Sequence, residues 1–595
     1  MGPESVHAAI AQHASATPVR TAVHAPDGSI TYAELDAAAG AVATALAARD
    51  VAPGTPVGIR LTPSIDYITA LLGTLQAGAA AMPLDPTLPR DRLAAMFESV
   101  VPALVLGRTG DSDDWREAVP QGMPAPDTIP IESLEPPPAA PAAPRLAPET
   151  TGYILFTSGS TGRPRAIAGR HAGLAHFIAW ECRTFALGPD CRIPLLAPTT
   201  FDVSLRDIFA PLVAGGCLAI PGQADRAGIV RLLDWLESAG VTHMHCVPSL
   251  FRAMLADLPH RAAPALPSLR CVLLAGEPLF FEDVRRWRDL AGGDAELVNL
   301  YGPTETTLAV AACRIGDLDA SSCTGIVPLG RPIDGAELLV LDGNRPCTPG
   351  ETGMIHVRTD FPTNGYIGNG ATGTGFIPNP VSGDPADRVF PTGDLGRRQA
   401  DGNIAFVGRQ DAQVKVNGVR IEPGDIEAAL LAHRAVTHAA VTATGDGRLA
   451  AFVVLDADAS AADLREHLLG RLPSNMIPST IEPLDALPLN AHGKLDRAAL
   501  ARRQPAAPRT GKLQTETETA LADLWRETLG VDEIAPDSSF LELGGDSLKA
   551  MQLIGQIYRA FAVEVTMADL LRHPTVGRLA EVVDSARAGA EVTAP

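Results

Sequence analysis

The 595-residue sequence lacks a surplus of basic residues and a paired-cysteine motif. Its 48 Lys and Arg residues stand against 69 Asp and Glu residues, and the net charge of −21 argues against a nucleic-acid-binding surface. None of its 8 cysteines forms a CxxC pair or a zinc-type spacing. We therefore expect reduced, mostly buried thiols.

Signals for export or membrane insertion are also missing. The N-terminal stretch MGPESVHAAIAQHASATP has no basic region followed by an apolar run, so no signal peptide is expected. The most apolar long window, residues 67–82, is interrupted by Gly73, Gln76 and Gly78. This pattern favours a buried helix over a membrane span. We expect a cytoplasmic protein without a membrane partner.

The length of the chain instead predicts three or more folded units. Helix-like and strand-like patterns alternate from the N-terminus to about residue 330, which indicates a mostly parallel sheet covered by helices. Residues 330–407 consist of short strand-like runs with many Gly and Pro turns, which indicates a β-rich subdomain. A Pro- and Ala-rich stretch at 133–149 reads as an exposed loop.

The C-terminal part holds two smaller units. Residues 412–500 have the texture of a compact α+β unit, and the linker 502–512 follows. Residues 514–586 read as almost wholly helical, with amphipathic runs at 517–529, 548–561 and 576–586. The stretch 408–427 divides the large body from the smaller ones and ends in a helix start at Pro423.

The segment from Thr157 to Arg165, TSGSTGRPR, directly follows the strand-like run at 153–156. Its glycines let backbone N–H groups come close to a ligand, its hydroxyls donate hydrogen bonds, and its arginines supply positive charge. These properties suit polyphosphate oxygens, although the segment is not a Walker A loop. From the residues alone, a flexible turn remains the alternative.

Further motifs follow in a fixed order: NLYGPTETT at 299–307, PTGDL at 391–395, LNAHGKLDR at 489–497 and FLELGGDSL at 540–548. Together they resemble the adenylation domains of non-ribosomal peptide synthetases, members of the adenylate-forming enzyme superfamily. The C-terminal unit resembles a peptidyl carrier protein. The resemblance implies an α/β adenylation core with a β-rich subdomain at 1–410, a small α+β subdomain at 411–503 and an all-α four-helix carrier domain at 514–586.

The resemblance also implies the activity. Such an enzyme uses ATP and Mg²⁺ to activate an α-amino acid as aminoacyl-AMP and releases pyrophosphate. It then transfers the aminoacyl group to a 4′-phosphopantetheine thiol, here expected on Ser547. The expected partners are a phosphopantetheinyl transferase, a condensation or tailoring enzyme acting in trans, and a small activator protein of the MbtH-like type. The HHxxxDG condensation signature and the GxSxG thioesterase elbow are absent from the sequence.

The resemblance also implies, by motif position, which residues bind the nucleotide. The phosphate-binding set is Thr157, Ser158, Gly159, Ser160, Thr161, Gly162 and Arg165. The adenosine-binding set is Asn299, Tyr301, Thr304, Asp394, Phe406 and Arg409, with Asn299 and Tyr301 on the adenine and Asp394 on the ribose. Glu305 is expected to coordinate Mg²⁺.

Lys494 is the expected catalytic cation. A carboxylate that attacks a phosphate brings two anions together, and a cation between them offsets the repulsion. Asp411 is the expected hinge of the small subdomain, and Lys415 is expected to face the site during thioester formation. Without the resemblance, Lys494 reads as an exposed turn residue and Ser547 as a helix cap.

Asp202 matches the position that binds the substrate α-amine. The expected side-chain pocket consists of Val203, Arg206, His245, Leu273, Ala275, Leu300, Leu308 and Ala309. Most of this lining is apolar, with Arg206 and His245 as potential donors. Because an unpaired buried Arg is costly, Arg206 either meets an anionic or strongly accepting substrate group or pairs with Asp207 or another acid.

Three motifs depart from the family pattern: PRA replaces PKG at 164–166, FPTGDL replaces YRTGDL at 390–395, and HGK replaces NGK at 492–494. Arg165 keeps the charge of the phosphate loop as a planar fork. Two alternatives therefore remain open. One is an acyl- or aryl-CoA ligase of the same fold, and the other is a carrier or scaffold protein without catalysis.

Overall fold

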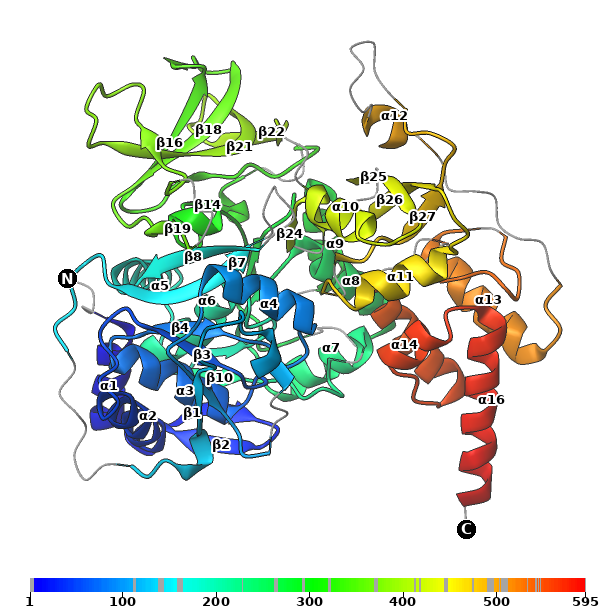
Figure 1. The fold of residues 1–595 in the computed structure, drawn as a ribbon, viewed down its shortest axis with the longest axis horizontal. Coiled ribbons are helices and arrows are strands. Elements are labelled where there is room, and N and C mark those ends of the chain that lie inside the picture. The colour runs from blue at the N-terminus through cyan, green and yellow to red at the C-terminus, as the bar shows by residue number, and fades with distance from the viewer. Residues whose placement is uncertain are drawn as a thin grey trace.

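A computed structural model describes residues 5–110, 114–136, 144–157, 164–226, 228–261, 266–291, 295–318, 323–368, 373–410, 414–416, 419–443, 448–473, 476–488, 497–501, 503, 512–531, 533–540, 543, 545 and 547–593. In Figure 1 a large N-terminal body, from blue to green, carries a β-rich layer at one end. A small subdomain (yellow) and a helical unit (orange to red) lie beside the large body.

The large body contains a seven-stranded sheet. Its strands, in sheet order, are β19 (Gly365–Ile367), β8 (Arg165–Arg170), β7 (Thr151–Thr157), β4 (Ala80–Pro83), β3 (Pro56–Ile59), β5 (Leu104–Gly107) and β6 (Asp127–Pro130). The run from β7 to β6 is parallel, while β8 and β19 are antiparallel additions. This arrangement confirms the mostly parallel sheet predicted for the N-terminal region.

Two further sheets complete the large body. The five-stranded sheet has the order β11 (His243–Cys246), β12 (Cys271–Ala275), β13 (Glu296–Tyr301), β14 (Ala311–Arg314) and β15 (Arg331–Pro332). The four-stranded sheet has the order β2 (Gly28–Thr31), β1 (Thr21–Ala25), β10 (Cys217–Ala219) and β9 (Arg192–Pro194). The predicted pocket residues from 245 to 300 thus lie on neighbouring parallel strands of one sheet.

Helices cover these sheets. They are α1 (Val6–Ala16), α2 (Tyr32–Ala47), α3 (Ile65–Gln76), α4 (Arg90–Ser99), α5 (His171–Thr184), α6 (Val203–Val213), α7 (Ile229–Ser238), α8 (Pro248–Asp257) and α9 (Phe281–Ala291). Thr31 and Glu34 form a capping box at the start of α2. The apolar window at 67–82 holds most of α3 and then β4, so the expected buried helix is followed by a buried strand.

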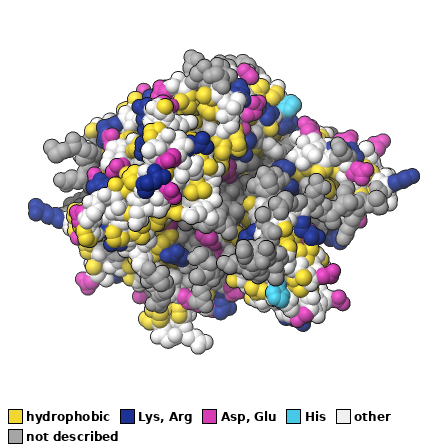
Figure 2. All heavy atoms as spheres, turned by 90° about the horizontal axis from the view of Figure 1, so that it is seen from above, with side chains coloured by type: hydrophobic (Ala, Val, Ile, Leu, Met, Phe, Trp, Pro, Cys, Tyr) yellow, Lys and Arg dark blue, Asp and Glu magenta, His cyan; other side chains and the backbone are white. Residues whose placement is uncertain are grey.

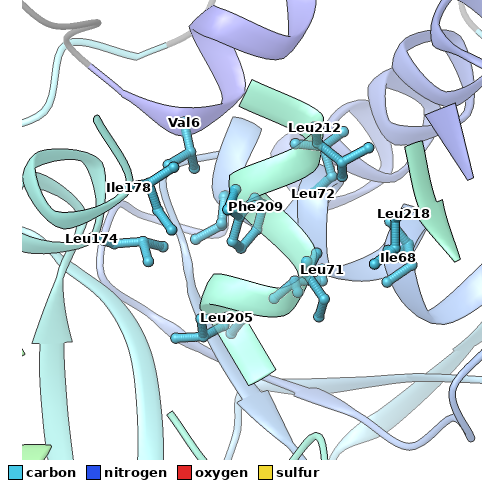
Figure 3. Packing of buried hydrophobic residues seen from close by; sticks show 14 of the residues in the cluster. Val6, Ile68, Leu71, Leu72, Leu174, Ile178, Leu205, Phe209, Leu212 and Leu218 are labelled. Atoms are coloured by element: carbon cyan, nitrogen blue, oxygen red, sulfur yellow. The ribbon is translucent and has the colours of Figure 1, made fainter. Parts of the chain in front are cut away.

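Helix α6 is fixed in the main core. Figure 3 shows Leu205, Phe209 and Leu212 of α6 surrounded by side chains from α1, α3 and α5. Phe209 is completely buried in this cluster. Because one face of α6 is anchored by this packing, the side chains on its opposite face have fixed positions at the site.

The predicted β-rich subdomain is a six-stranded antiparallel sheet. Its strands are β17 (Arg345–Pro346), β16 (Ala336–Asp342), β18 (Thr352–Thr359), β21 (Arg388–Arg398), β20 (Ile377–Pro378) and β22 (Ile404–Arg409). Pairing of β21 with β22 places Asp394 opposite Arg409. The sheet therefore brings two of the expected ribose-binding residues together.

The small subdomain pairs β23 (Val414–Val416) with β24 (Val419–Ile421) and contains a sheet of β25 (Val436–Ala443), β26 (Leu449–Leu455) and β27 (Thr480–Pro483). Its helices are α10 (Pro423–Leu431), α11 (Ala461–Leu469) and α12 (Arg497–Ala501). Helix α10 begins at Pro423, as predicted. These elements have the α+β composition that the sequence indicated.

The C-terminal unit consists of α13 (Glu516–Leu529), α14 (Ser547–Phe561), α15 (Met567–Arg572) and α16 (Val576–Thr593). Trp525 and Phe540 meet edge to face in its core, with ring centroids 5.3 Å apart. The predicted fold class is confirmed throughout. The residue boundaries expected for the three domains stay predictions.

The face of the molecule shown in Figure 2 carries basic and acidic side chains interspersed with apolar ones.

All 8 cysteines are free thiols, and Cys191, Cys246, Cys271 and Cys313 are buried. Within the described part of the chain, no helix combines the length and the hydropathy that a membrane crossing requires.

Candidate functional site

A cavity of about 1460 Å³ lies where all parts of the structure meet. The large body contributes most of its wall, the β-rich sheet contributes Asp394, Phe406 and Arg409, and the small subdomain contributes Leu472 and Met476. The C-terminal helix α14 adds Lys549 and Gln552. Predicted site residues that line this cavity are Thr157, Asp202, Val203, Arg206, His245, Ala275, Asn299, Leu300, Tyr301, Thr304, Leu308, Ala309, Asp394, Phe406 and Arg409.

The expected adenosine-binding end is organised around Asp394. The Tyr301 hydroxyl donates to Asp394 Oδ2 at 2.6 Å, and Arg409 Nη1 donates to Asp394 Oδ1 at 2.5 Å. Burial and the Asp394 charge raise the pKa of Tyr301 well above its ordinary value, so the phenol stays a donor. The Asn299 amide nitrogen donates to the Pro328 carbonyl at 2.8 Å. These bonds preset the orientation of the polar groups before any ligand binds.

Glu305, the expected Mg²⁺ ligand, lies behind the cavity wall and is fully buried. The Tyr366 hydroxyl donates to Glu305 Oε1, and the Arg165 guanidinium stacks 3.4 Å from the centroid of the Tyr366 ring. Tyr366 therefore connects the phosphate loop to Glu305. The flat guanidinium of Arg165 is suited to this stacking in a way that a Lys ammonium is not. Tyr366 was missed at the sequence level because nothing nearby in the chain marks it as a partner of Glu305.

A magnesium site at Glu305 agrees with the chemistry of the ion. Mg²⁺ is commonly held by one or two carboxylates, with substrate phosphates and water as its other ligands. Among the described residues, no group of three or more His, Cys, Asp or Glu side chains could hold a metal ion. A single buried carboxylate, joined through Tyr366 to Arg165 of the expected phosphate-binding segment, fits an ion that arrives with the nucleotide.

Asp202 stands directly before α6 and lines the cavity. Burial raises the pKa of its carboxyl, while a hydrogen bond from Thr304 and the Arg206 charge act in the opposite direction. Leu308, which lines the same cavity, adopts a left-handed φ of 62°, next to Thr307 at 67°. Strained backbone of this kind is concentrated at functional sites.

His245 is clamped between two buried acids. Its Nδ1 donates to Asp207 Oδ1 at 2.9 Å, and its Nε2 donates to Glu181 Oε1 at 2.8 Å. Burial alone would lower the pKa of His245, but the Glu181 charge and the bonds to both carboxylates raise it above its ordinary value. The expectation of a donor toward the substrate is therefore wrong for His245, since both ring nitrogens are already bonded.

Leu273 is the second correction. Its side chain is 1% exposed, packs in the main core and does not line the cavity. Ala275 lies two residues later on the same face of β12, and as the last residue of the strand it reaches the cavity.

Several predicted residues lie outside the described part of the chain. These are Lys494, Asp411, Ser158, Gly159, Ser160, Thr161 and Gly162. For Lys415 and Ser547 the structure places the backbone, in β23 and at the first residue of α14, without describing the side chain. The roles expected for all of them stay predictions.

Gly545, two residues before Ser547, is held against the core of the C-terminal unit. Its N–H donates to the Phe540 carbonyl at 2.7 Å, and a Cβ at this position would lie 2.2 Å from the Phe540 ring. Only a glycine tolerates this approach. The glycine of the LGGDSL motif thus fixes the chain just before α14 begins.

Helix α14 also packs against α7 and α8 of the large body (Figure 1). A Cβ at Gly555 of α14 would lie 2.8 Å from Val230 Cγ2 of α7, so α14 and α7 approach closely at this point. Arg559 forms an ion pair with Asp257, and Arg231 forms one with Glu564. Arg231 also lies 5.0 Å from the centroid of the Tyr558 ring. The close contact at Gly555 is thus accompanied by two ion pairs between the carrier domain and the large body.

The Arg559–Asp257 pair gives a testable expectation. Asp257 is 7% exposed, so Arg559→Asp places two carboxylates together where water screens them poorly. We expect thioester loading in single turnover to slow about tenfold, while adenylate formation is unchanged. Asp257→Arg should slow thioester loading by a similar factor. The double variant Asp257→Arg with Arg559→Asp should restore the loading rate. Equal loading rates in wild type and both single variants would contradict this role.

Comparison with known protein families agrees with this geometry. The model of the AMP-binding enzyme family matches residues 10–367. The chain belongs to this family. The AMP-binding enzyme C-terminal domain matches residues 425–494, and the phosphopantetheine attachment site matches residues 519–583. The chain is thus an adenylation domain fused to a carrier domain.

Curated proteins similar to this chain include peptide synthetases. The chain is 36% identical to a probable non-canonical nonribosomal peptide synthetase, CymA, of Salinispora arenicola, over 95% of this chain and 7% of that protein. It is 34% identical to the isonitrile lipopeptide synthase of Streptomyces coeruleorubidus over 96% of this chain and 39% of that protein. The chain thus spans well under half the length of these curated relatives.

Solved structures show the same organisation. A holo nonribosomal peptide synthetase protein with adenylation and peptidyl carrier (PCP) domains, bound to a vinylsulfonamide inhibitor, superposes with a TM-score of 0.81. The identity is 30%, over 98% of this chain and 97% of that one. The o-succinylbenzoate CoA synthetase of Bacillus subtilis shares the fold, with a TM-score of 0.71 and 23% identity over 83% of this chain and 98% of that one.

These matches support an adenylate-forming ligase that uses ATP with Mg²⁺ and carries a phosphopantetheine attachment site. The structure agrees with a site for ATP and with a carrier helix next to it. Asp394, Tyr301 and Arg409 form a group of polar side chains in the cavity wall, and α14 contributes Lys549 and Gln552 to the wall of the same cavity.

Proposed function

We propose that this chain activates an α-amino acid as aminoacyl-AMP and transfers it to phosphopantetheine on Ser547 of its own carrier domain. The observation that best supports this proposal is the position of Asp202. It lines the same cavity as Asp394 and as Lys549 of the carrier domain. A carboxylate whose pKa is raised by burial gains from a cation. The α-ammonium of an amino acid supplies that cation.

The other residues take roles that follow from their chemistry. Asp394 accepts hydrogen bonds from the ribose hydroxyls, with Arg409 and Tyr301 holding its carboxylate in place. Arg165 offsets phosphate charge, and Glu305 holds the Mg²⁺ that accompanies ATP. Lys494 is the proposed catalytic cation, because a positive charge between the substrate carboxylate and the α-phosphate oxygens would reduce the repulsion between two anions.

The second half-reaction needs the carrier at the cavity. Lys549 and Gln552 already line its wall, so α14 is placed where an arm attached to Ser547 could enter. We propose that a rotation of the small subdomain about Asp411 exchanges Lys494 for Lys415 between the two half-reactions. The loaded thioester then passes to a condensation or tailoring enzyme. The need for an activator protein stays a prediction.

Pyrophosphate exchange with matched acid pairs tests this function. Each amino acid is compared with the same acid lacking the α-amine, in the presence and absence of free CoA. We expect exchange with amino acids only, no CoA thioester, and a mass increase of the phosphopantetheinylated protein. Exchange supported by des-amino acids, together with release of an acyl-CoA, would assign the chain to the CoA ligases instead.

A further inference from the structure

Helix α6 presents opposite charges one turn apart. Asp202 stands at the start of this helix and Arg206 four residues later, and both line the cavity. Residues at this spacing lie on the same face of a helix and rise by about 6 Å along its axis. A ligand in contact with this face therefore meets a carboxylate and then a guanidinium.

Arg206 is buried without a hydrogen-bond partner for its Nε. Its side chain is 3% exposed, and no ion pair of Arg206 occurs within the described residues. A buried guanidinium without a paired anion costs folding free energy. The neighbouring charge of Asp202 offsets part of this cost, since each group affects the other without forming a salt bridge.

The acids that could neutralise Arg206 are engaged elsewhere. Asp207 Oδ2 accepts from the backbone N–H groups of Leu196 and Ala197 at 3.1 Å, and its Oδ1 accepts from His245. Glu181 accepts from the other ring nitrogen of His245. Its second carboxylate oxygen is buried without a hydrogen-bond partner, but Glu181 does not line the cavity. The alternative in which Arg206 pairs with Asp207 is therefore excluded.

Glu277 also lines the cavity, but its carboxylate accepts hydrogen bonds from the N–H and the hydroxyl of Ser249 and lies 3.9 Å from Arg252. The other residues of the predicted side-chain pocket that line the cavity are aliphatic, namely Val203, Ala275, Leu300, Leu308 and Ala309. An apolar substrate side chain would fill this space but leave the guanidinium unpaired. A carboxylate would both fill it and form a charge-assisted, bidentate hydrogen-bond pair.

We propose that the substrate is an acidic α-amino acid, with its side-chain carboxylate bound by Arg206 and its α-ammonium bound by Asp202. The inference rests on the proposed function and adds the substrate class to it. Helix α6 then contacts both charged ends of the substrate, whose charge order is complementary to that of the helix face. Arg206 is the specificity-determining residue.

Pyrophosphate exchange by the full chain, with aspartate, glutamate and 2-aminoadipate against asparagine, glutamine, leucine and methionine, tests the inference. We expect the best acidic amino acid to exceed every neutral one by about 100-fold in kcat/KM, because an unpaired buried cation penalises neutral substrates. Arg206→Met keeps the apolar stem and removes the charge. It should lose the acidic substrate by a similar factor and gain activity with a neutral one.

Arg252→Met is the matched control. Arg252 lines the same cavity but is paired with Asp283 at 3.2 Å, so its loss should leave the ratio of acidic to neutral activity unchanged. Binding of ATP alone, measured by calorimetry, shows whether each variant is folded. Exchange by the wild type with neutral amino acids only would overturn the acidic assignment and leave the proposed function standing. Exchange with no amino acid would overturn the proposed function itself.

Discussion

Replacement of Ser547 with alanine is expected to abolish covalent loading completely and to leave pyrophosphate exchange at the wild-type rate. The hydroxyl of Ser547 is the proposed attachment point for phosphopantetheine, and alanine cannot form that bond. The adenylation site is built from other residues, so the first half-reaction does not need this side chain. Intact-protein mass after treatment with a phosphopantetheinyl transferase, and then with substrate and ATP, measures both steps.

Ser585→Ala is the control for this experiment. Ser585 is an exposed serine on α16 of the same carrier domain, and its hydroxyl donates to the Glu581 carbonyl at 2.7 Å. This variant should load as the wild type does. Phosphopantetheine on the Ser547→Ala protein would show that another residue is the attachment point.

Replacement of Asp202 with alanine is expected to reduce kcat/KM for amino-acid-dependent exchange about 100-fold or more. The substrate ammonium would then enter a largely apolar pocket without its counter-charge, and loss of one partner of a buried charge pair costs about 2–5 kcal/mol. Asp85→Ala is the matched control. Asp85 is another carboxylate of the cavity wall, but it accepts hydrogen bonds from Thr87, and we expect its loss to leave KM for the amino acid unchanged.

Thermal stability separates a binding role of Asp202 from a structural one. Because its pKa in the folded protein is raised, Asp202 contributes stability below its unfolded pKa and loses that contribution as pH rises through the folded value. Ionisation of this buried carboxyl therefore opposes folding. Asp202→Ala should melt at the wild-type temperature or above. A lower melting temperature together with an unchanged KM would contradict the binding role.

Much of the fold could be predicted because local signals agree with the tertiary structure. The helix start at Pro423 and the starts of the amphipathic helices of the carrier all appear at the expected places. Helix α16 is the exception, since it continues to Thr593 instead of ending near residue 586. Exposed helix ends carry little periodic signal, so their limits are the least determined by sequence.

The site was predicted less completely, because its decisive contacts join residues far apart in the chain. His245 looked like a substrate donor until Glu181, 64 residues away, was seen to bond to it. Tyr366 lies 61 residues from Glu305, and Arg559 lies 302 residues from Asp257. No local pattern encodes such pairs. Leu273 was misassigned because it lies in the middle of β12, where its side chain packs in the core, and only the end of the strand at Ala275 reaches the cavity.

For redesign of the pocket, residue 245 matters as much as residue 206. The His245 imidazole keeps two carboxylates occupied immediately beside Arg206. A neutral residue of similar size at 245 would release Asp207 and Glu181 to neutralise the guanidinium from behind the wall. An engineer seeking an enzyme for aliphatic amino acids thus has a route that leaves the substrate-facing surface untouched. The same dependence means that a single mutation at His245, a residue with no free ring nitrogen, would change the amino acid that the proposed enzyme activates.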